Sequence, residues 1–443
     1  MSQTQTEIYK NAFSRAPVSN EAESLTWLRD IRQKAYRRFQ TLGFPTRRME
    51  GWRYIDLELI VGASFVPDGQ RSVDAASLKR FERFFFCRLE QNRIAFVNGV
   101  YAKELSSGVG LPDGVILENL AAAVCSRREL LEPYLAAHIE KESNAFHLIN
   151  TFSFRDGVFL YVPENVSITV PIHILFGAAA KEDRPIVFYP RILVVAEKGS
   201  SAKIVVDHVA GADDNFFSNF VLESHLGAGA SVQYSQVQRY GQKAVQMVSN
   251  RFGLREKSAL RVMSFKRGGR VTRDEAQVDF IGENASAFLK GLSVLSGESE
   301  VYQHAVVNHH VPSCVSRQFY KNILAEKSKS EFNSLVFVEK GAFKSDSEQL
   351  NKNLLLSDEA RSYSRPQLRI HADDVSCTHG ATVGQLRGDE LFYLRSRGFS
   401  KKMAEFMLTY GFAKEVIQEV EPENVRVELE AWASEELKRV MKL

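Results

Sequence analysis

The amino-acid sequence predicts a mainly β protein in which a parallel β-helix core is flanked by helical regions. The first observation is the hydrophobic period: apolar residues recur every three to four positions near both termini, but every second position in the middle. The second is a set of turn-like clusters that return at a nearly constant interval in the middle part. The third is composition: with 443 residues, 44% hydrophobic and 25% charged, the chain can bury a large core.

The N-terminal region, residues 1–155, is predicted to be mainly helical with a small β component. Apolar side chains recur at helical spacing in residues 25–35 and again in residues 130–139. Between these segments, residues 93–100 (RIAFVNGV) have the composition of a strand and contain the turn-forming pair Asn98-Gly99. We therefore expect a mixed domain ahead of the repeats.

The central region, residues 156–385, is predicted to consist of many short strands. Its apolar residues alternate with polar ones, and no segment shows convincing helical spacing. The clearest strands are residues 158–162, 192–195, 203–206, 220–222 and 335–338. A region of this kind forms a sandwich, a barrel, a propeller or a solenoid.

The spacing of the turns favours the solenoid. Clusters of small or acidic residues begin at positions 197, 228, 256, 283 and 339, so consecutive clusters lie 31, 28, 27 and 56 residues apart, the last being two steps of 28. A period of about 20 to 50 residues is typical of repeat proteins, and two or three short strands per period fit one coil of a β-helix. An irregular β-sandwich is the alternative interpretation.

The C-terminal region, residues 386–443, returns to helical spacing. A first short helix is predicted to stop at Arg397-Gly398, and two further apolar stripes follow it. The last stripe is formed by Val425, Leu429, Trp432, Leu437 and Val440. These stripes are most simply the core of a helical domain, and an exposed part of them would bind a partner.

Charge, cysteine content and the start of the chain limit the function. A net charge of +3 without a run of Lys and Arg argues against nucleic-acid binding. The scattered residues Cys87, Cys125, Cys314 and Cys377 do not suggest a disulfide framework. The first residues (MSQTQTEIYKNAF) lack the order of a signal peptide, and no apolar run is long enough to span a membrane. We expect a cytoplasmic protein in a reducing compartment.

Most catalytic and metal-binding motifs are missing from the sequence. There is no GxxxxGK[ST] phosphate loop, no GxSxG elbow and no HExxH zinc helix. The densest histidine group, His304 with His309-His310, is expected to be structural or exposed, because adjacent strand residues point to opposite faces. Asp373-Asp374 could be paired carboxylates, but they are equally expected as turn residues.

The strongest candidate for chemistry is the pair Cys377 and His379. In an extended strand, residues two apart point to the same face, so one thiol and one imidazole can reach the same ion. Two ligands do not complete a tetrahedral site, and the others would come from elsewhere in the chain or from another subunit. The alternatives are a packed cysteine beside a histidine that hydrogen-bonds in a turn.

The C-terminal sequence also resembles a known family. ADDVSCTHGATVGQL, followed by DELFYLRSRGF, closely resembles the C-terminal block of the SufB/SufD family of iron–sulfur cluster assembly proteins, and MEGWRYIDL resembles an N-terminal element of that family. The form Cys-x-His-Gly-Ala-Thr is similar to the SufD branch rather than to the SufB branch. The chain departs from the family pattern at Ser334, at Arg369 and at Arg387-Gly388, positions that bear on partner surfaces rather than on the fold.

The resemblance implies a right-handed parallel β-helix between helical domains and a non-catalytic scaffold role. It implies that the β-helix pairs with SufB, that the C-terminal helices bind the ATPase SufC, and that an iron–sulfur cluster forms transiently at a shared interface. His379 matches the implicated histidine of the family, and Cys377 is the second candidate ligand. A SufB-like main scaffold, a β-helix enzyme acting on polysaccharides and a purely architectural solenoid are the alternatives.

Overall fold

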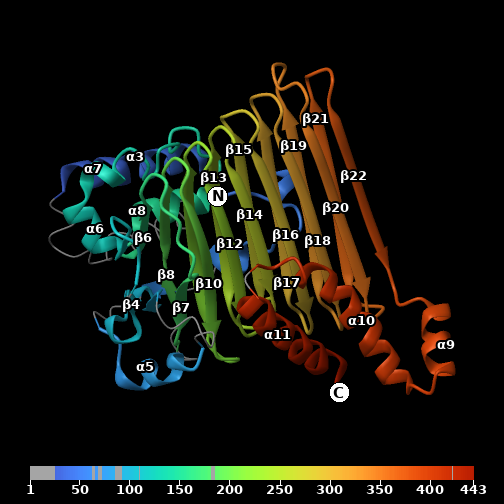
Figure 1. The fold of residues 1–443 in the computed structure, drawn as a ribbon. Helices are drawn as coiled ribbons and strands as arrows, with labels where there is room; N and C mark the ends of the chain where they lie inside the picture. The colour runs from blue at the N-terminus through green and yellow to red at the C-terminus, as the bar shows by residue number, and fades with distance from the viewer. Residues whose placement is uncertain are drawn as a thin grey trace.

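The molecule is a long solenoid of β-strands with helices packed against its outer faces (Figure 1). The structure is a computed structural model that describes residues 25–443 apart from residues 62–64, 68–71, 85–91, 109, 181–184 and 422. Cys87 and the initial segment compared above with signal peptides lie outside the described part. Within that part, no helix is long and apolar enough to cross a membrane.

The predicted parallel β-solenoid is confirmed, with about 7 turns over residues 157–384. Its strands alternate along the chain between two parallel sheets. The strands of the first sheet, here sheet A, are β6 (Gly157–Val162), β9 (Arg191–Ala196), β11 (Phe216–Leu226), β13 (Val245–Leu254), β15 (Val271–Phe280), β17 (Glu300–His309), β19 (Lys329–Val338) and β21 (Arg361–Ile370). Those of sheet B are β7 (Ile172–Ala178), β10 (Ser201–Ala210), β12 (Ser231–Arg239), β14 (Ala259–Lys266), β16 (Ser286–Leu295), β18 (Val315–Leu324), β20 (Asp346–Leu355) and β22 (Ser376–Gly384).

The turn interval seen in the sequence is the length of one coil. Each strand hydrogen-bonds to the strand one coil further on, so equivalent residues stack in straight files along the solenoid axis. At the start of the sheet B strands, one such file consists of Ser201, Ser231, Ala259, Ser286, Val315, Asp346 and Ser376. The interior between the two sheets is a continuous hydrophobic core over most of the length.

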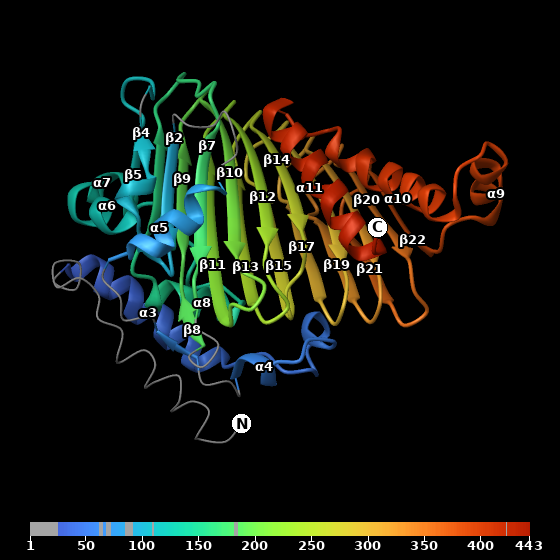
Figure 2. The same cartoon turned by 90° about the horizontal axis from the view of Figure 1, so that it is seen from below.

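The N-terminal region covers the outer face of sheet A. The helices α3 (Thr26–Leu42) and α8 (Ala145–Ser153) pack on each other and on apolar residues of that face (Figure 2). Strand β2 (Asn92–Val97) extends sheet B beside β7, and β5 (Ile116–Asn119) pairs with β6. The other elements are η1 (Glu50–Trp52), α4 (Glu58–Val61), β1 (Val66–Pro67), α5 (Ala75–Glu82), β3 (Val100–Tyr101), η2 (Lys103–Leu105), β4 (Ser107–Gly108), α6 (Leu120–Ser126), α7 (Arg128–Leu131) and β8 (Ile186–Phe188).

The helix expected over residues 130–139 forms only in part. Helix α7 ends at Leu131, and turns follow it. Pro133 has no N–H to donate, and Ala136 has a φ of 56°, which no helix contains. The N–H of Ala136 instead donates to the buried carboxylate of Glu223 at 3.1 Å. A carboxylate from a distant strand therefore accepts the backbone hydrogen bond of a residue for which the apolar spacing alone predicted a helix.

The C-terminal helices lie along the outer face of sheet B. Helices α10 (Lys401–Ile417) and α11 (Glu423–Met441) pack on apolar residues of β10 to β20. The predicted stripe of α11 is buried at every position: Val425, Leu429, Trp432, Leu437 and Val440. By contrast, α9 (Gly388–Ser396) buries no residue and projects beyond the last coil of the solenoid (Figure 1).

Candidate functional site

The last coil of the solenoid is open. Strand β22 pairs with β20 on one side only, and β21 pairs only with β19 in the described part of the chain. Most residues of β22 are exposed, and β21 is largely half-buried, whereas the strands of the preceding coils are mostly buried. The N-terminal end differs, because β2 and β5 extend the two sheets there.

Cys377 and His379 lie on β22, at this open end. Their register partners on β20 are Ser347 and Gln349, both of which are buried between the sheets. Because register partners in a parallel sheet point to the same side, both side chains belong to the inner face of the solenoid. The two residues therefore share one face, about 7 Å apart along the strand.

Each of the two residues is the last member of an interior file. The file that ends in Cys377 consists of Ala202, Val232, Leu260, Ala287, Ser316 and Ser347. The file that ends in His379 consists of Ile204, Tyr234, Val262, Leu289, Gln318 and Gln349. In both files the side chains are mainly apolar in the early coils and polar in the last two before the candidate ligand.

The polar side chains below the open end are held by hydrogen bonds. Ser316 Oγ donates to Ser347 Oγ at 2.9 Å and also lies 3.0 Å from Nε2 of the buried His309. Gln349 Nε2 donates to Ser334 Oγ at 3.1 Å. Buried polar groups that are hydrogen-bonded hold one another in fixed positions. The polar side chains of the two coils before the candidate ligands, here called the polar floor, are therefore ordered.

The two candidate ligands differ in their surroundings. Cys377 is half-buried and packs against the hydrophobic core, whereas His379 is exposed. Burial raises the pKa of the Cys377 thiol, and the nearby Asp346 carboxylate raises it further. Because the thiolate is the form that binds metal, the isolated chain holds Cys377 protonated, and binding of a metal there would release that proton.

The other residues considered in the sequence do not join this pair. His304 lies on the outer face of sheet A, 3.5 Å from Glu275, and His309 points into the core. His310 lies outside, between the carboxylates of Asp279 and Glu339. Asp373-Asp374 form the turn before β22, in which Asp374 has a φ of 53° and its carbonyl accepts the N–H of Lys344.

The described residues contain no group of three or more His, Cys, Asp or Glu side chains placed to hold a metal ion. Cys377 and His379 are therefore two candidate metal ligands, a soft thiolate and a less soft imidazole. They lie on one face of the last strand, at the end of the solenoid where no further coil follows. Thiolate suits iron and other soft metals, and imidazole suits iron as well. A complete ligand set at this end would need donors from outside the described chain.

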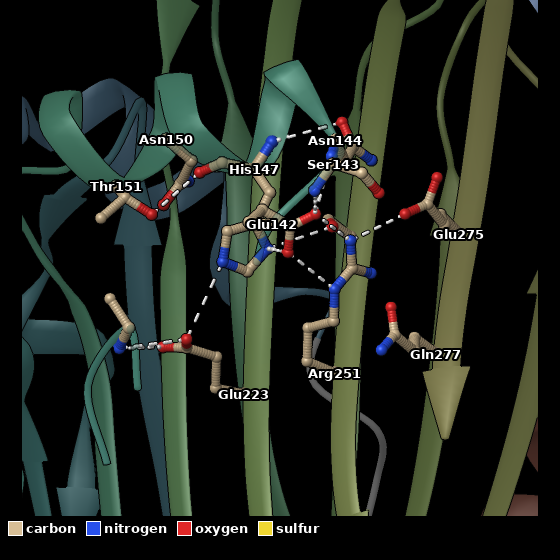
Figure 3. A network of polar contacts seen from close by, with 12 residues as sticks. Glu142, Ser143, Asn144, His147, Asn150, Thr151, Glu223, Arg251, Glu275 and Gln277 are labelled. Atoms are coloured by element: carbon tan, nitrogen blue, oxygen red, sulfur yellow. Dashed lines mark hydrogen bonds and ion pairs between the residues drawn. The ribbon is translucent and has the colours of Figure 1, made fainter. Parts of the chain in front are cut away.

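A second polar centre, which no motif in the sequence indicates, joins the N-terminal region to the solenoid (Figure 3). Arg251 on β13 donates to Glu142 at 2.8 Å and to Glu275 on β15 at 2.8 Å. His147 on α8 lies 3.6 Å from Glu142 and 3.8 Å from Glu223. All five side chains are almost completely buried, so the network fastens α8 and the loop before it to the outer face of sheet A.

Burial and charge set the protonation of this centre. Burial alone raises the pKa of Glu142, but the charge of Arg251, its hydrogen bond and the interaction with His147 together outweigh burial, and the resulting pKa is about 2. Burial lowers the pKa of His147 to about 4, against the attraction of Glu142. At neutral pH the centre therefore contains a neutral histidine between two ionised carboxylates, of which Glu142 pairs with Arg251 and Glu223 pairs with Arg191.

We expect the free energy of unfolding to decrease as the pH falls from 7 to 5. Burial lowers the pKa to between about 3 and about 4 for four histidines, His147, His173, His208 and His309. An unfolded histidine titrates near 6.5, so below that pH the unfolded chain binds protons that the folded chain excludes. At pH 5, each such histidine therefore lowers the free energy of unfolding by about 2 kcal/mol.

Urea denaturation at the two pH values measures this effect. Burial raises the pKa of Asp156 and of Asp207 to about 6, so these two groups stabilise the folded chain as the pH falls. They offset only part of the loss, because they are fewer than the histidines and their pKa shifts are smaller. The variant His147→Gln should lose about 2 kcal/mol less than the wild type between pH 7 and pH 5. The exposed His138→Gln serves as control, and an equal pH dependence in all three proteins would contradict the assignment.

Comparison with known proteins identifies the class to which this fold and site belong. The SufBD core domain of the SUF system for FeS cluster assembly matches residues 178–412, and the SufBD N-terminal region matches residues 3–174. The class is therefore that of proteins of iron–sulfur cluster assembly. The chain belongs to the SufBD family, as the C-terminal motifs predicted.

Several relatives align over almost the whole chain. A SufBD family protein of Synechocystis is 30% identical over 427 residues, which cover 94% of this chain and 93% of the relative. The protein SufD of Escherichia coli is 28% identical and covers 87% of both chains. The protein SufD of Bacillus subtilis is 24% identical and covers 93% of this chain and 94% of its own.

Proposed function

We propose that the chain is a non-catalytic scaffold subunit that acts, as SufD, in an iron–sulfur cluster assembly complex. The observation that carries this proposal is the position of Cys377 and His379 at the open end of the solenoid, on one face and without further ligands in the described chain. The nascent cluster is then a cargo held between this end and a second subunit. His379 would supply an imidazole and Cys377 a thiolate to its iron.

The second subunit is proposed to be SufB, paired through the edge of β22. Ser376 donates its N–H to Ser345 of the preceding coil at 2.9 Å. Because backbone groups alternate in direction along a parallel strand, those of Cys377, His379, Ala381 and Val383 point to the open side. This edge contains no proline and no charged residue except His379 when protonated, so it can take up a strand from another chain.

The ATPase SufC is proposed to bind at the C-terminal helices. Large apolar side chains are exposed around α9 and the start of α10: Phe392 (74%), Tyr393 (57%), Phe399 (40%), Met403 (48%) and Met407 (39%). Helix α9 buries none of its residues, so Phe392 and Tyr393 contribute little to the core. An exposed apolar group of this kind is typical of a protein interface.

Co-expression with SufB and SufC tests the proposal, and we expect a stable ternary complex. The double variant Phe392→Asp and Tyr393→Asp should lose SufC, because it puts two charges into the proposed apolar contact, while it keeps SufB and its own thermal stability. Val427→Asp is the matched control, since Val427 is an exposed apolar residue on α11. Co-purification and mass photometry provide the readout.

Two outcomes would contradict this part of the account. If the wild-type chain purified alone in the presence of both partners, the scaffold role would be wrong. If the Phe392 and Tyr393 variant bound SufC as tightly as the Val427 variant, the ATPase contact would lie elsewhere on the molecule.

A further inference from the structure

We propose that residues 49–57, here called the strap, are a latch that fastens the last coil of the solenoid to the N-terminal region. The strap is the segment MEGWRYIDL, which lies between α3 and α4. Figure 2 shows the chain between these two helices reaching along the solenoid towards its later coils. The inference goes beyond the proposed function, because it concerns how the last coil is kept ordered and requires no partner.

The last coil has less support than the coils before it. A strand inside the solenoid hydrogen-bonds to a neighbour on each side, whereas β21 pairs with β19 alone in the described part of the chain. None of the residues of β21 is fully buried, so few apolar contacts hold this strand. Local opening begins where backbone pairing and buried contacts are fewest, and β21 is therefore expected to open before the inner strands unless another segment holds it.

The middle of the strap is anchored on the outer face of sheet A. Trp52 is buried, its ring centroid lies 5.5 Å from that of Phe146 on α8, and the guanidinium carbon of Arg273 on β15 lies 3.9 Å from its ring centroid. Arg273 Nη1 also donates to the carbonyl oxygen of Gly51 at 2.6 Å. The same arginine donates to Glu275 at 3.1 Å, which connects the anchor to the buried polar centre of Figure 3. A buried cation–π contact and a charge-assisted hydrogen bond together hold this part firmly.

Two side chains of the strap, Glu50 and Tyr54, reach β21 itself. The rings of Tyr54 and Tyr363 are stacked, with their centroids 4.3 Å apart and an interplanar angle of 9°. Arg365 lies 3.2 Å from Glu50, and its guanidinium carbon lies 5.1 Å from the ring centroid of Tyr54. The hydroxyl of Tyr302 on β17 lies 2.8 Å from the carbonyl oxygen of Tyr54. The strap therefore spans the solenoid from β15 to β21.

The anchor and the contacts with β21 differ in solvent exposure. Trp52 is 8% exposed and Arg273 3%, whereas the side chain of Glu50 is 63% exposed and both stacked tyrosines are half-buried. An exposed ion pair and a single ring stack are weak contacts. The strap can therefore release β21 while it stays bound to β15. The order of the last coil then depends on a segment of the N-terminal region.

Hydrogen–deuterium exchange of the full chain, measured by mass spectrometry of its peptides, tests the inference. Tyr54→Ala should speed the exchange of the β21 amides by about three- to tenfold, because loss of the ring stack makes this strand easier to open. Exchange in β13, in the middle of sheet A, should be unchanged. Tyr54→Phe is the matched control, since it keeps the ring, and it should retain most of the protection of β21.

Two further variants show whether the strap acts through its contacts with β21. In a Tyr363→Ala background, Tyr54→Ala should add little to the exchange rate, because both substitutions break the same stack. Glu50→Gln should speed the exchange of β21 at low ionic strength. That effect should shrink at high ionic strength, since the pair with Arg365 is exposed and salt screens it.

Equal exchange of β21 in the wild type and in Tyr54→Ala would overturn the inference, and so would additive effects of Tyr54→Ala and Tyr363→Ala. A rise of the same size in β13 would also contradict it, because the strap would then stabilise the whole solenoid rather than its last coil. None of these results bears on the scaffold role, which co-purification with SufB and SufC tests separately.

Discussion

Replacement of Arg251 by alanine is expected to lower the free energy of unfolding by about 3 to 5 kcal/mol, because it leaves the buried carboxylate of Glu142 without its arginine and removes one of the two arginines that pair with Glu275. Arg251 is the shared donor to Glu142 and Glu275, with distances of 2.8 Å to each. The network they form joins α8 and the preceding loop to the solenoid. Equilibrium denaturation in urea, followed by far-ultraviolet circular dichroism, measures the loss.

Two further variants show whether the loss comes from the unpaired charges. Arg128→Ala is the matched control, because Arg128 also pairs with a glutamate, Glu132, but on the surface, where water and salt screen the interaction and it contributes little. The double variant Arg251→Met with Glu142→Gln also removes the carboxylate that the loss of Arg251 leaves unpaired, and it should recover part of the stability. A loss below about 1 kcal/mol for Arg251→Ala would contradict the structural role of the network.

Much of the solenoid could be predicted from the sequence because its determinants are local. Strand character depends on alternation and β-branched residues, and the coil length appears directly as the interval between turns. The position of Cys377 and His379 on one face follows from their spacing alone. The stripe of α11 was predictable for the same reason, since its period of three to four residues reports which side is buried.

Other features depend on contacts between distant parts of the chain, which no local pattern encodes. Glu142 and Arg251 are 109 residues apart, so their pairing follows only once α8 is placed on sheet A. The helix predicted over residues 130–139 is interrupted because Glu223 binds the N–H of Ala136. The polar floor below Cys377 and His379 needs the register of β18, β20 and β22, which the turn interval gives only to within a few residues.

The second large effect is expected for His379→Ala. If His379 is a ligand at a site shared with another subunit, its loss should reduce the iron and sulfide retained by the complex at least about tenfold, because a ligand is lost where the others are few. The fold and the pairing should be unchanged, since the His379 side chain is exposed and has no hydrogen bond to any other residue that the structure describes. Cys377→Ser should act in the same direction.

Thr378→Ala is the matched control for this experiment. Thr378 lies between the two candidate ligands on β22, but its side chain belongs to the outer face. The control variant should assemble a cluster as the wild type does. A loss of iron in the Thr378 variant would mean that the strand edge, rather than the imidazole, is required.

The iron and acid-labile sulfide content of the anaerobically reconstituted complex therefore tests the central claim most directly. The account predicts that the His379→Ala complex contains all its subunits and has lost most of its cluster, while the Thr378→Ala complex retains the wild-type amount. An intact His379→Ala complex with undiminished iron and sulfide would contradict it, and would remove the open end of the solenoid from the site of cluster assembly.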